Sequence, residues 1–186
     1  MKAADPLEAM FGPRSVAVVG ASRRPGSAGA VALQQLRAGG YKGPIYPVNP
    51  NYDEVAGLAC YPELGALPGP ADMAILALPN AALESQMAVA ARSEVRSVVI
   101  FASGHETPPS GHGSLVERLA NAARGAGIVV CGGNCMGFVD VERGLRALAF
   151  PERDDLKSGP ITWLSHSGSA FTALLHNDRG LRFNLA

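Results

Sequence analysis

The residues best suited to hold a ligand are the small and basic ones in SVAVVGASRRPGSAG, residues 15–29. An apolar run breaks at Gly20 into alanine, serine, two arginines, proline and two further glycines. The later glycines remove side-chain bulk where backbone N–H groups could approach a phosphate, and Arg23 or Arg24 could add charge-assisted contacts. A plain glycine-rich turn with solvated arginines is the alternative. The pattern favours a phosphate-binding loop before a helix.

The glycine spacing separates the candidate phosphate ligands. Gly20, Gly26 and Gly29 do not form the Gly-x-Gly-x-x-Gly pattern of dinucleotide-binding folds. A later apolar run ends in Asn49 and Pro50, where a nicotinamide nucleotide site needs an acidic residue for the ribose hydroxyls. The chain also lacks the Gly-Lys-Ser/Thr sequence of a P-loop. A nicotinamide-dependent oxidoreductase and a P-loop NTPase are therefore both disfavoured.

Short apolar runs that alternate with longer helical patterns must position this loop. Apolar runs without in–out alternation are typical of strands buried on both faces of a parallel sheet. Their alternation with helices predicts an α/β fold with a Rossmann-like, doubly wound parallel sheet. The expected strands are 15–20, 43–48, 72–79, 97–102 and 127–132, and the expected helices are 28–39, 81–93 and 113–127.

A change of composition late in the chain predicts a domain boundary. Residues 151–160, PERDDLKSGP, are polar and bracketed by prolines, and an apolar strand (161–168) and a helix (169–180) follow. One strand–helix unit cannot cover its own apolar faces. We therefore expect a Rossmann-like domain over residues 1–150. Residues 151–186 are expected to be the first βα unit of a second domain, either truncated or completed by another chain.

Composition and charge disfavour several classes of partner. The 186 residues are 47% hydrophobic and carry 16 basic and 16 acidic side chains, so no net charge attracts nucleic acid. Asp5 and Glu8 lie where a signal peptide needs an apolar core, and no apolar run approaches the roughly 18 residues of a membrane span. We expect a cytoplasmic protein with no membrane partner. Cys60, Cys131 and Cys135 lack Cys-x-x-Cys spacing, so neither a disulfide framework nor a metal site is indicated.

Several segments, taken in order, resemble the CoA-binding domain of NDP-forming (ADP-forming) acyl-CoA synthetases, relatives of the succinyl-CoA synthetase alpha subunit. The resemblance covers nearly the whole chain. It rests on SVAVVGASRRPGSAG, YKGPIYPVNPNYDEVAGLACYPEL, PGPADMAILALP, VVIFASG, GGNCMGF and GPITWLSHSGSAFTALL. It implies that the unit after residue 150 begins a flavodoxin-like domain.

The resemblance also implies that CoA binds as a substrate, with its diphosphate at the first strand–helix turn. Two residues after the second strand match the family's strand tip, three residues after the fourth strand lie near the adenine, and an asparagine lies near the pantetheine end. The implied contacts are Gly20, Ala21, Ser22, Arg23, Gly26 and Ser27 at the turn, then Asn49 and Pro50, then Phe101, Ala102 and Ser103, and finally Asn134.

The family's activity is implied for a longer protein or complex. Its reaction makes acyl-CoA from a carboxylate, CoA and NTP, and releases NDP and phosphate through an acyl phosphate and a phosphohistidine. The histidine and the ATP-grasp domain or subunit, with ATP and Mg²⁺, would come from other sequence, so we expect no catalytic residue here. A stand-alone regulatory CoA-binding protein and the N-terminal part of a CoA-dependent protein acetyltransferase are the alternatives. A homo-oligomer is compatible with each.

A few residues depart from the family pattern or receive no implied role. Asn51 stands where the succinyl-CoA synthetase relatives carry a lysine that helps to hold CoA. His166 follows a predicted strand where a helix begins, a place that favours anions. Because the family's phosphohistidine comes from later sequence, we expect His166 to be a loop residue. Cys135 follows Asn134 and is expected to be a passive residue in a turn near the CoA thiol.

Overall fold

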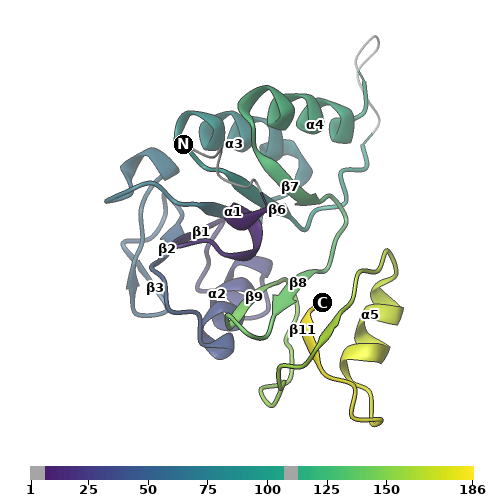
Figure 1. Ribbon diagram of the computed structural model, residues 1–186. Coiled ribbons are helices and arrows are strands. Elements are labelled where there is room, and N and C mark those ends of the chain that lie inside the picture. Colours follow the sequence, from purple (N-terminus) through teal and green to yellow (C-terminus); the bar gives the residue numbers. More distant parts are fainter. Residues whose placement is uncertain (1–6, 107–112) are drawn as a thin grey trace, which may run out of the picture.

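The computed structural model describes residues 7–106 and 113–186. Its main layer is a five-stranded parallel sheet with the order β2-β1-β5-β6-β7. Figure 1 shows α3 and α4 together on one face of this sheet and α2 on the other. The strands are β1 (Val16–Val19), β2 (Ile45–Val48), β5 (Met73–Leu76), β6 (Ser97–Ile100) and β7 (Val129–Gly132). The predicted Rossmann-like fold is confirmed, and each of the five predicted strands is present.

Two of the three long helices, α2 and α4, have side-chain caps at their first residues and a left-handed glycine after their last. The Ser27 side chain accepts a hydrogen bond from the Ala30 N–H at the start of α2, and Gly40 ends that helix with a left-handed φ of 82°. Ser114 and Glu117 form a capping box at the start of α4. The helices are α2 (Ala28–Gly39), α3 (Asn80–Arg92) and α4 (Leu115–Ala126).

The sheet separates two apolar cores, and each strand contributes to both. On β1, Val16 and Val18 belong to the core that contains α2, whereas Ala17 and Val19 belong to the core under α3 and α4. All four side chains are buried, as expected for a strand covered on both faces. Because the parallel strands run in register, their carboxyl ends lie along one edge of the sheet. The turns expected to bind a ligand follow these ends.

An ion-pair cluster fixes the opposite edge of the sheet. The carboxylate of Asp72, just before β5, accepts hydrogen bonds from the Arg14 N–H at 2.8 Å and from Arg14 Nε at 3.0 Å. Arg96 Nη2 donates to its other oxygen at 2.8 Å. Burial alone would raise the pKa of Asp72, but the hydrogen bonds from both arginines outweigh it and lower that pKa to about 2.

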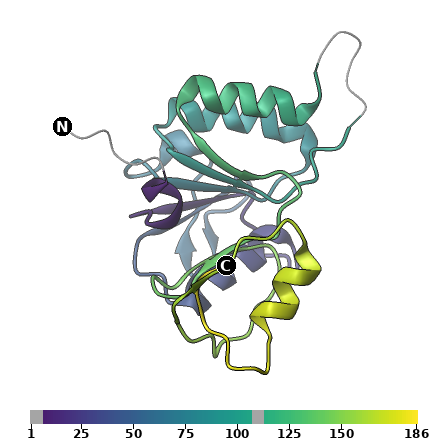
Figure 2. The ribbon, with the colours of Figure 1, turned by 45° about the vertical axis from the view of Figure 1, so that its right-hand side comes forward.

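A second, smaller sheet lies beside the main one, with the strand order β10-β11-β8-β9. Figure 2 shows it on the side of the main sheet that α2 covers, with α5 packed beside it. Strands β8 and β9 form an antiparallel hairpin, and β11 pairs with β8 on one side and with β10 on the other. The elements are β8 (Gly137–Asp140), β9 (Leu145–Leu148), β10 (Ile161–Thr162), α5 (Gly168–Leu175) and β11 (Phe183–Leu185).

The hairpin joins the smaller sheet to the main core. Leu145 of β9 packs in the core that contains Leu33 of α2. Leu148 belongs to a third core with Phe171 of α5 and Phe183 of β11. The strand–helix unit after residue 150 therefore shares its core with residues that precede that position. Sequence reasoning predicted β10 and α5 but neither the hairpin nor β11, and the boundary near residue 150 stays a prediction.

Four short elements complete the described chain. They are α1 (Glu8–Phe11), β3 (Glu54–Val55), β4 (Leu58–Ala59) and the 3₁₀ helix η1 (Leu64–Ala66). Strands β3 and β4 pair as a two-residue antiparallel ribbon. Among the helices of residues 7–106 and 113–186, none has the length and apolar character needed to cross a bilayer.

Candidate functional site

A cavity of about 490 Å³ opens over the turn between β1 and α2. Its walls come from the residues that follow β1, β2, β5 and β6, at the carboxyl edge of the sheet. Six predicted site residues line it, namely Gly20, Ser22, Ser27, Asn49, Phe101 and Ala102. Five further residues complete the lining, namely Arg24, Ala28, Gly29, Ala77 and Leu78.

The start of α2 supplies backbone donors to this cavity. The N–H groups of Ala28 and Gly29 belong to the first turn, where an α-helix offers no carbonyl partner. Together with the helix dipole they favour an anion. Gly29 lies so close to the preceding turn that a Cβ would be 2.0 Å from the carbonyl oxygen of Gly20. Glycine is therefore required there for the helix to approach β1.

Gly26 has a different reason to be glycine. Its φ is +74°, in the left-handed region, and a Cβ there would meet no atom within 4 Å. The backbone conformation, and not a nearby atom, thus disfavours a side chain at Gly26. The open surroundings leave room for a ligand next to Ser27, whose hydroxyl donates to the Arg24 carbonyl at 2.8 Å.

The two arginines of the turn have different surroundings. Arg23 Nε donates to the Glu54 carbonyl at 2.9 Å, and its guanidinium lies 5.1 Å from the centre of the Tyr52 ring. These contacts hold Arg23 against the segment that follows β2. Arg24 instead lines the cavity. The sequence suggested either arginine as a phosphate contact, and Arg24, left out of the predicted set, is the one at the cavity wall.

Asn49 holds the ends of two strands together. Its Nδ2 donates to the Ala21 carbonyl at 2.7 Å, and its Oδ1 accepts the Asn51 N–H at 2.9 Å. Ala21 is fully buried, and its carbonyl is taken by Asn49. Pro50 and Ser103 are outside the lining of the cavity, as are Ala21, Arg23 and Gly26, and the ligand contacts predicted for all of them stay predictions.

A second cavity, of about 680 Å³, lies between the end of β7 and the start of α5. Residues 131–138 and 163–168 form most of its wall, so it contains both Asn134 and His166. The Asn134 N–H donates to the carbonyl of Ala102 at 2.8 Å, and Ala102 lines the first cavity. A residue in the wall of one cavity is therefore hydrogen-bonded to a residue in the wall of the other. His166 is exposed in its loop, as the sequence predicted.

The sequence of this region matches a known family. Residues 14–140, from before β1 to the end of β8, match the family described as a CoA binding domain. The chain belongs to this family. The match includes the glycine-rich turn, Asn49, the residues after β6 and Asn134, and so covers the whole predicted CoA site.

Similar proteins are ADP-forming ligases. The chain is 35% identical over 162 residues to acetate–CoA ligase [ADP-forming] II of Archaeoglobus fulgidus, covering 87% of this chain and 24% of that protein. It is 32% identical over 173 residues to the alpha subunit of acetate–CoA ligase [ADP-forming] I of Pyrococcus furiosus, covering 91% of this chain and 37% of that subunit.

A solved structure shows the same fold. Acetyl-coenzyme A synthetase 1 of Candidatus Korarchaeum cryptofilum, in complex with phosphate and ADP, superimposes with a TM-score of 0.80 at 32% identity. The alignment covers 91% of this chain and 36% of that one. The chain spans about a quarter of the length of the two acetate–CoA ligases of Archaeoglobus that it matches. What it shares with these ligases is their CoA-binding part.

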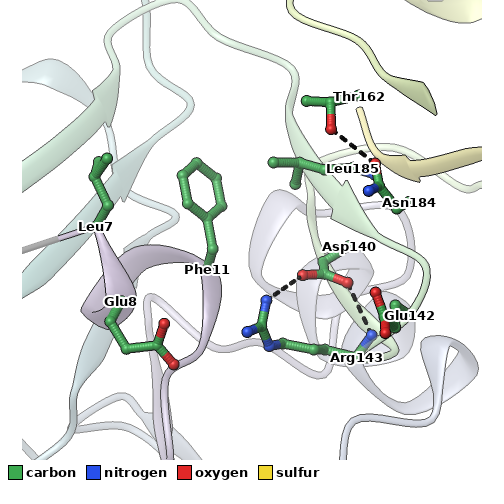
Figure 3. Close-up of a pocket in the computed structure, with 9 residues that line it drawn as sticks. All are labelled: Leu7, Glu8, Phe11, Asp140, Glu142, Arg143, Thr162, Asn184 and Leu185. Atoms are coloured by element: carbon green, nitrogen blue, oxygen red, sulfur yellow. Dashed lines mark hydrogen bonds and ion pairs between the residues drawn. The ribbon is translucent and has the colours of Figure 1, made fainter. Parts of the chain in front are cut away.

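A third cavity, of about 300 Å³, lies between α1 and the smaller sheet. None of the residues predicted to contact CoA lines it. Figure 3 shows the Asp140 carboxylate bonded to the backbone and guanidinium of Arg143, at 2.8 and 3.1 Å. Thr162 donates to Asn184 at 2.8 Å on the same wall, and Leu7, Glu8 and Phe11 form the wall that faces them. Across the described ranges, no group of three or more histidine, cysteine or acidic side chains is arranged to hold a metal ion.

Proposed function

We propose that this chain supplies the CoA-binding part of an ADP-forming acyl-CoA synthetase, which joins a carboxylate to CoA at the expense of a nucleoside triphosphate. The observation that carries the proposal is the cavity over the β1–α2 turn. Helix N–H groups, a glycine-rich backbone and Arg24 meet there, within a CoA binding domain.

The diphosphate of CoA would bind at the start of α2, beside Arg24. The N–H groups of Ala28 and Gly29 and the guanidinium of Arg24 would donate to its oxygens. The adenine would lie by Phe101 and Ala102, at the opposite wall. The phosphates would then lie next to donors, and the adenine ring would lie next to an aromatic side chain.

The pantetheine arm would run from the first cavity into the second. Support comes from the hydrogen bond between Ala102, which lines the first cavity, and Asn134, which lines the second. The thiol would then lie near Cys135 and the start of α5, in a cavity of about 680 Å³. Acyl transfer to CoA would take place there.

The remaining steps need residues outside this chain. ATP, Mg²⁺ and the phosphohistidine would belong to an ATP-grasp domain or subunit, and the relative named as an alpha subunit supports a subunit partner. Residues 1–150 would bind CoA, and residues 151–186 would begin the domain that contacts this partner. We expect the purified chain to make no acyl-CoA from acetate, ATP and CoA, and measurable turnover would contradict this division of labour.

Calorimetry on adjacent arginine variants tests the CoA site. We expect CoA to bind in the micromolar range and NADH far more weakly. Arg24→Gln should weaken CoA binding by a factor of about 10 to 100, since a hydrogen bond to a charged group contributes roughly 1.5–3 kcal/mol. The matched control, Arg23→Gln, should leave CoA affinity nearly unchanged, because Arg23 is bonded to Glu54. Tighter binding of NADH, or a larger loss in Arg23→Gln, would overturn the assignment.

A further inference from the structure

Two cysteines face each other in the wall of the second cavity. Cys131 lies in β7, and Cys135 follows four residues later, after the chain has turned back. Their sulfur atoms are 3.9 Å apart, and both residues line the cavity of about 680 Å³. A small oxidant that enters the cavity can therefore reach both thiols. Cys60, the third cysteine of the chain, is bonded instead to the Asn49 carbonyl at 3.6 Å.

The two thiols differ in acidity because of this contact. The Cys131 thiol donates toward the sulfur of Cys135 and lowers the pKa of Cys135 to about 7. The same hydrogen bond, together with burial, raises the pKa of Cys131. A thiolate is the reactive form of cysteine, so Cys135 is the better nucleophile of the pair. Cys131 stays protonated beside it, in the position of a resolving thiol.

We propose that Cys131 and Cys135 are a redox-active pair that a hydroperoxide converts into an intramolecular disulfide. The Cys135 thiolate attacks the peroxide, so that an S–O bond forms, the O–O bond breaks and the leaving oxygen takes up a proton. Cys131 then attacks the sulfur of the resulting sulfenic acid, so that the S–S bond forms and the S–O bond breaks. With hydrogen peroxide, two thiols and one peroxide give one disulfide and two waters.

Formation of this disulfide requires only a local movement of the two cysteines. The sulfur atoms must move from 3.9 Å to the roughly 2.05 Å of a disulfide bond. The residues between them are Gly132, Gly133 and Asn134. Disulfides in reducing compartments are mostly transient and regulatory, which suits an accessible pair in a cavity. The proposal goes beyond CoA binding, and CoA is absent from its test.

Peptide mass after peroxide treatment gives a direct test. Both cysteines lie on one tryptic peptide, residues 125–143, whereas Cys60 lies on another. We expect this peptide to lose two hydrogen masses after peroxide treatment of the full chain, and dithiothreitol to restore them. Alkylation without reduction should label only Cys60. Cys60→Ser is the matched control and should form the same disulfide.

Single serine variants test the order of attack. Cys131→Ser should accumulate a sulfenic acid at Cys135 that a dimedone probe traps, whereas Cys135→Ser should resist peroxide. Trp163, the single tryptophan of the chain, lines the same cavity. Its fluorescence should change reversibly on oxidation of the wild type and of Cys60→Ser, but not of Cys135→Ser.

Two results would overturn the proposal. One is a wild-type peptide 125–143 that gains oxygen atoms without losing two hydrogens. The other is a disulfide that joins two chains instead of two residues of one chain. Both results are measured on the wild-type protein, so this test does not depend on whether the serine variants fold.

Discussion

The substitution Gly26→Val, compared with Gly40→Val, distinguishes the effect of a side chain on CoA binding from its effect on backbone strain. Gly26 lies just before Ser27, the residue that caps α2, with a φ of +74° and open surroundings. A branched side chain there would occupy the space beside the first N–H groups of α2. Gly40 ends the same helix with a φ of +82° and equally open surroundings. Gly40→Val therefore imposes similar strain about 18 Å away, at the rise of 1.5 Å per residue.

The loss of stability is expected in both variants, whereas the loss of CoA affinity is expected only in Gly26→Val. A side chain in the left-handed region costs about 1–2 kcal/mol, and at both positions a Cβ would meet no atom within 4 Å that adds to this cost. Both variants should thus lose about 1–2 kcal/mol of the free energy of unfolding, a fall of roughly 2–8 °C in Tm for a chain of this length. An anion at a helix N-terminus gains up to about 2 kcal/mol when partly buried. Gly26→Val should therefore also weaken CoA binding about tenfold.

Thermal unfolding and calorimetric titration with CoA, made on the same samples, distinguish the two effects. We expect a similar fall in Tm for Gly26→Val and Gly40→Val, and a raised Kd for CoA only in Gly26→Val. If the Kd of the two variants agrees within twofold, the diphosphate does not approach α2 at Gly26, and the placement of CoA is refuted.

Three further predictions concern stability. Gly29→Ala should lower the free energy of unfolding by about 3 kcal/mol or more, because its Cβ would be 2.0 Å from the Gly20 carbonyl oxygen, and an unchanged Tm would contradict that packing. The free energy of unfolding should fall by about 2 kcal/mol between about pH 5 and pH 2 because of Asp72. Arg14 and Arg96 lower the pKa of Asp72 from 3.8 to about 2 in the folded chain. The stabilisation is therefore present above the ordinary pKa and is lost as the pH falls toward the folded-state pKa. Urea unfolding across this range checks it, and an equally steep loss in Asp72→Asn would exclude Asp72 as the cause. Leu145→Ala, in the buried hairpin, should lower the free energy of unfolding by about 2–5 kcal/mol. Leu164→Ala is the control and should change it little, because Leu164 is 78% exposed. Equal midpoints of denaturant unfolding for the two variants would show that the hairpin does not stabilise the core.

Local sequence patterns were sufficient for most of the main sheet. The predicted helix 28–39 has the observed bounds of α2, because a serine cap precedes it and Gly40 ends it. The three central strands, β1, β5 and β6, are short and buried on both faces, and this state leaves a nearly continuous apolar run in the sequence. The glycine-rich turn was also recognisable, since its small residues mark where no side chain would block a close approach to the backbone.

The smaller sheet was less visible in the sequence. Strands β8 and β9 have four residues each, and Gly144, with a φ of +67°, lies in the turn between them. That glycine between two apolar stretches is the signal that could have indicated a hairpin. Strand β11 pairs with β8 from more than 40 residues away in the chain, and no local pattern specifies such a partner.

The tertiary structure alone decided which side chains meet at the site. Arg23 and Arg24 are equivalent in the sequence, but Arg23 contacts Glu54 and Tyr52, whereas Arg24 lines the cavity. The sequence by itself determined that a glycine-rich turn precedes α2, because the backbone conformation of a turn depends on its own residues. The direction of a long side chain depends on what the rest of the fold places beside it, and this information is spread over distant segments.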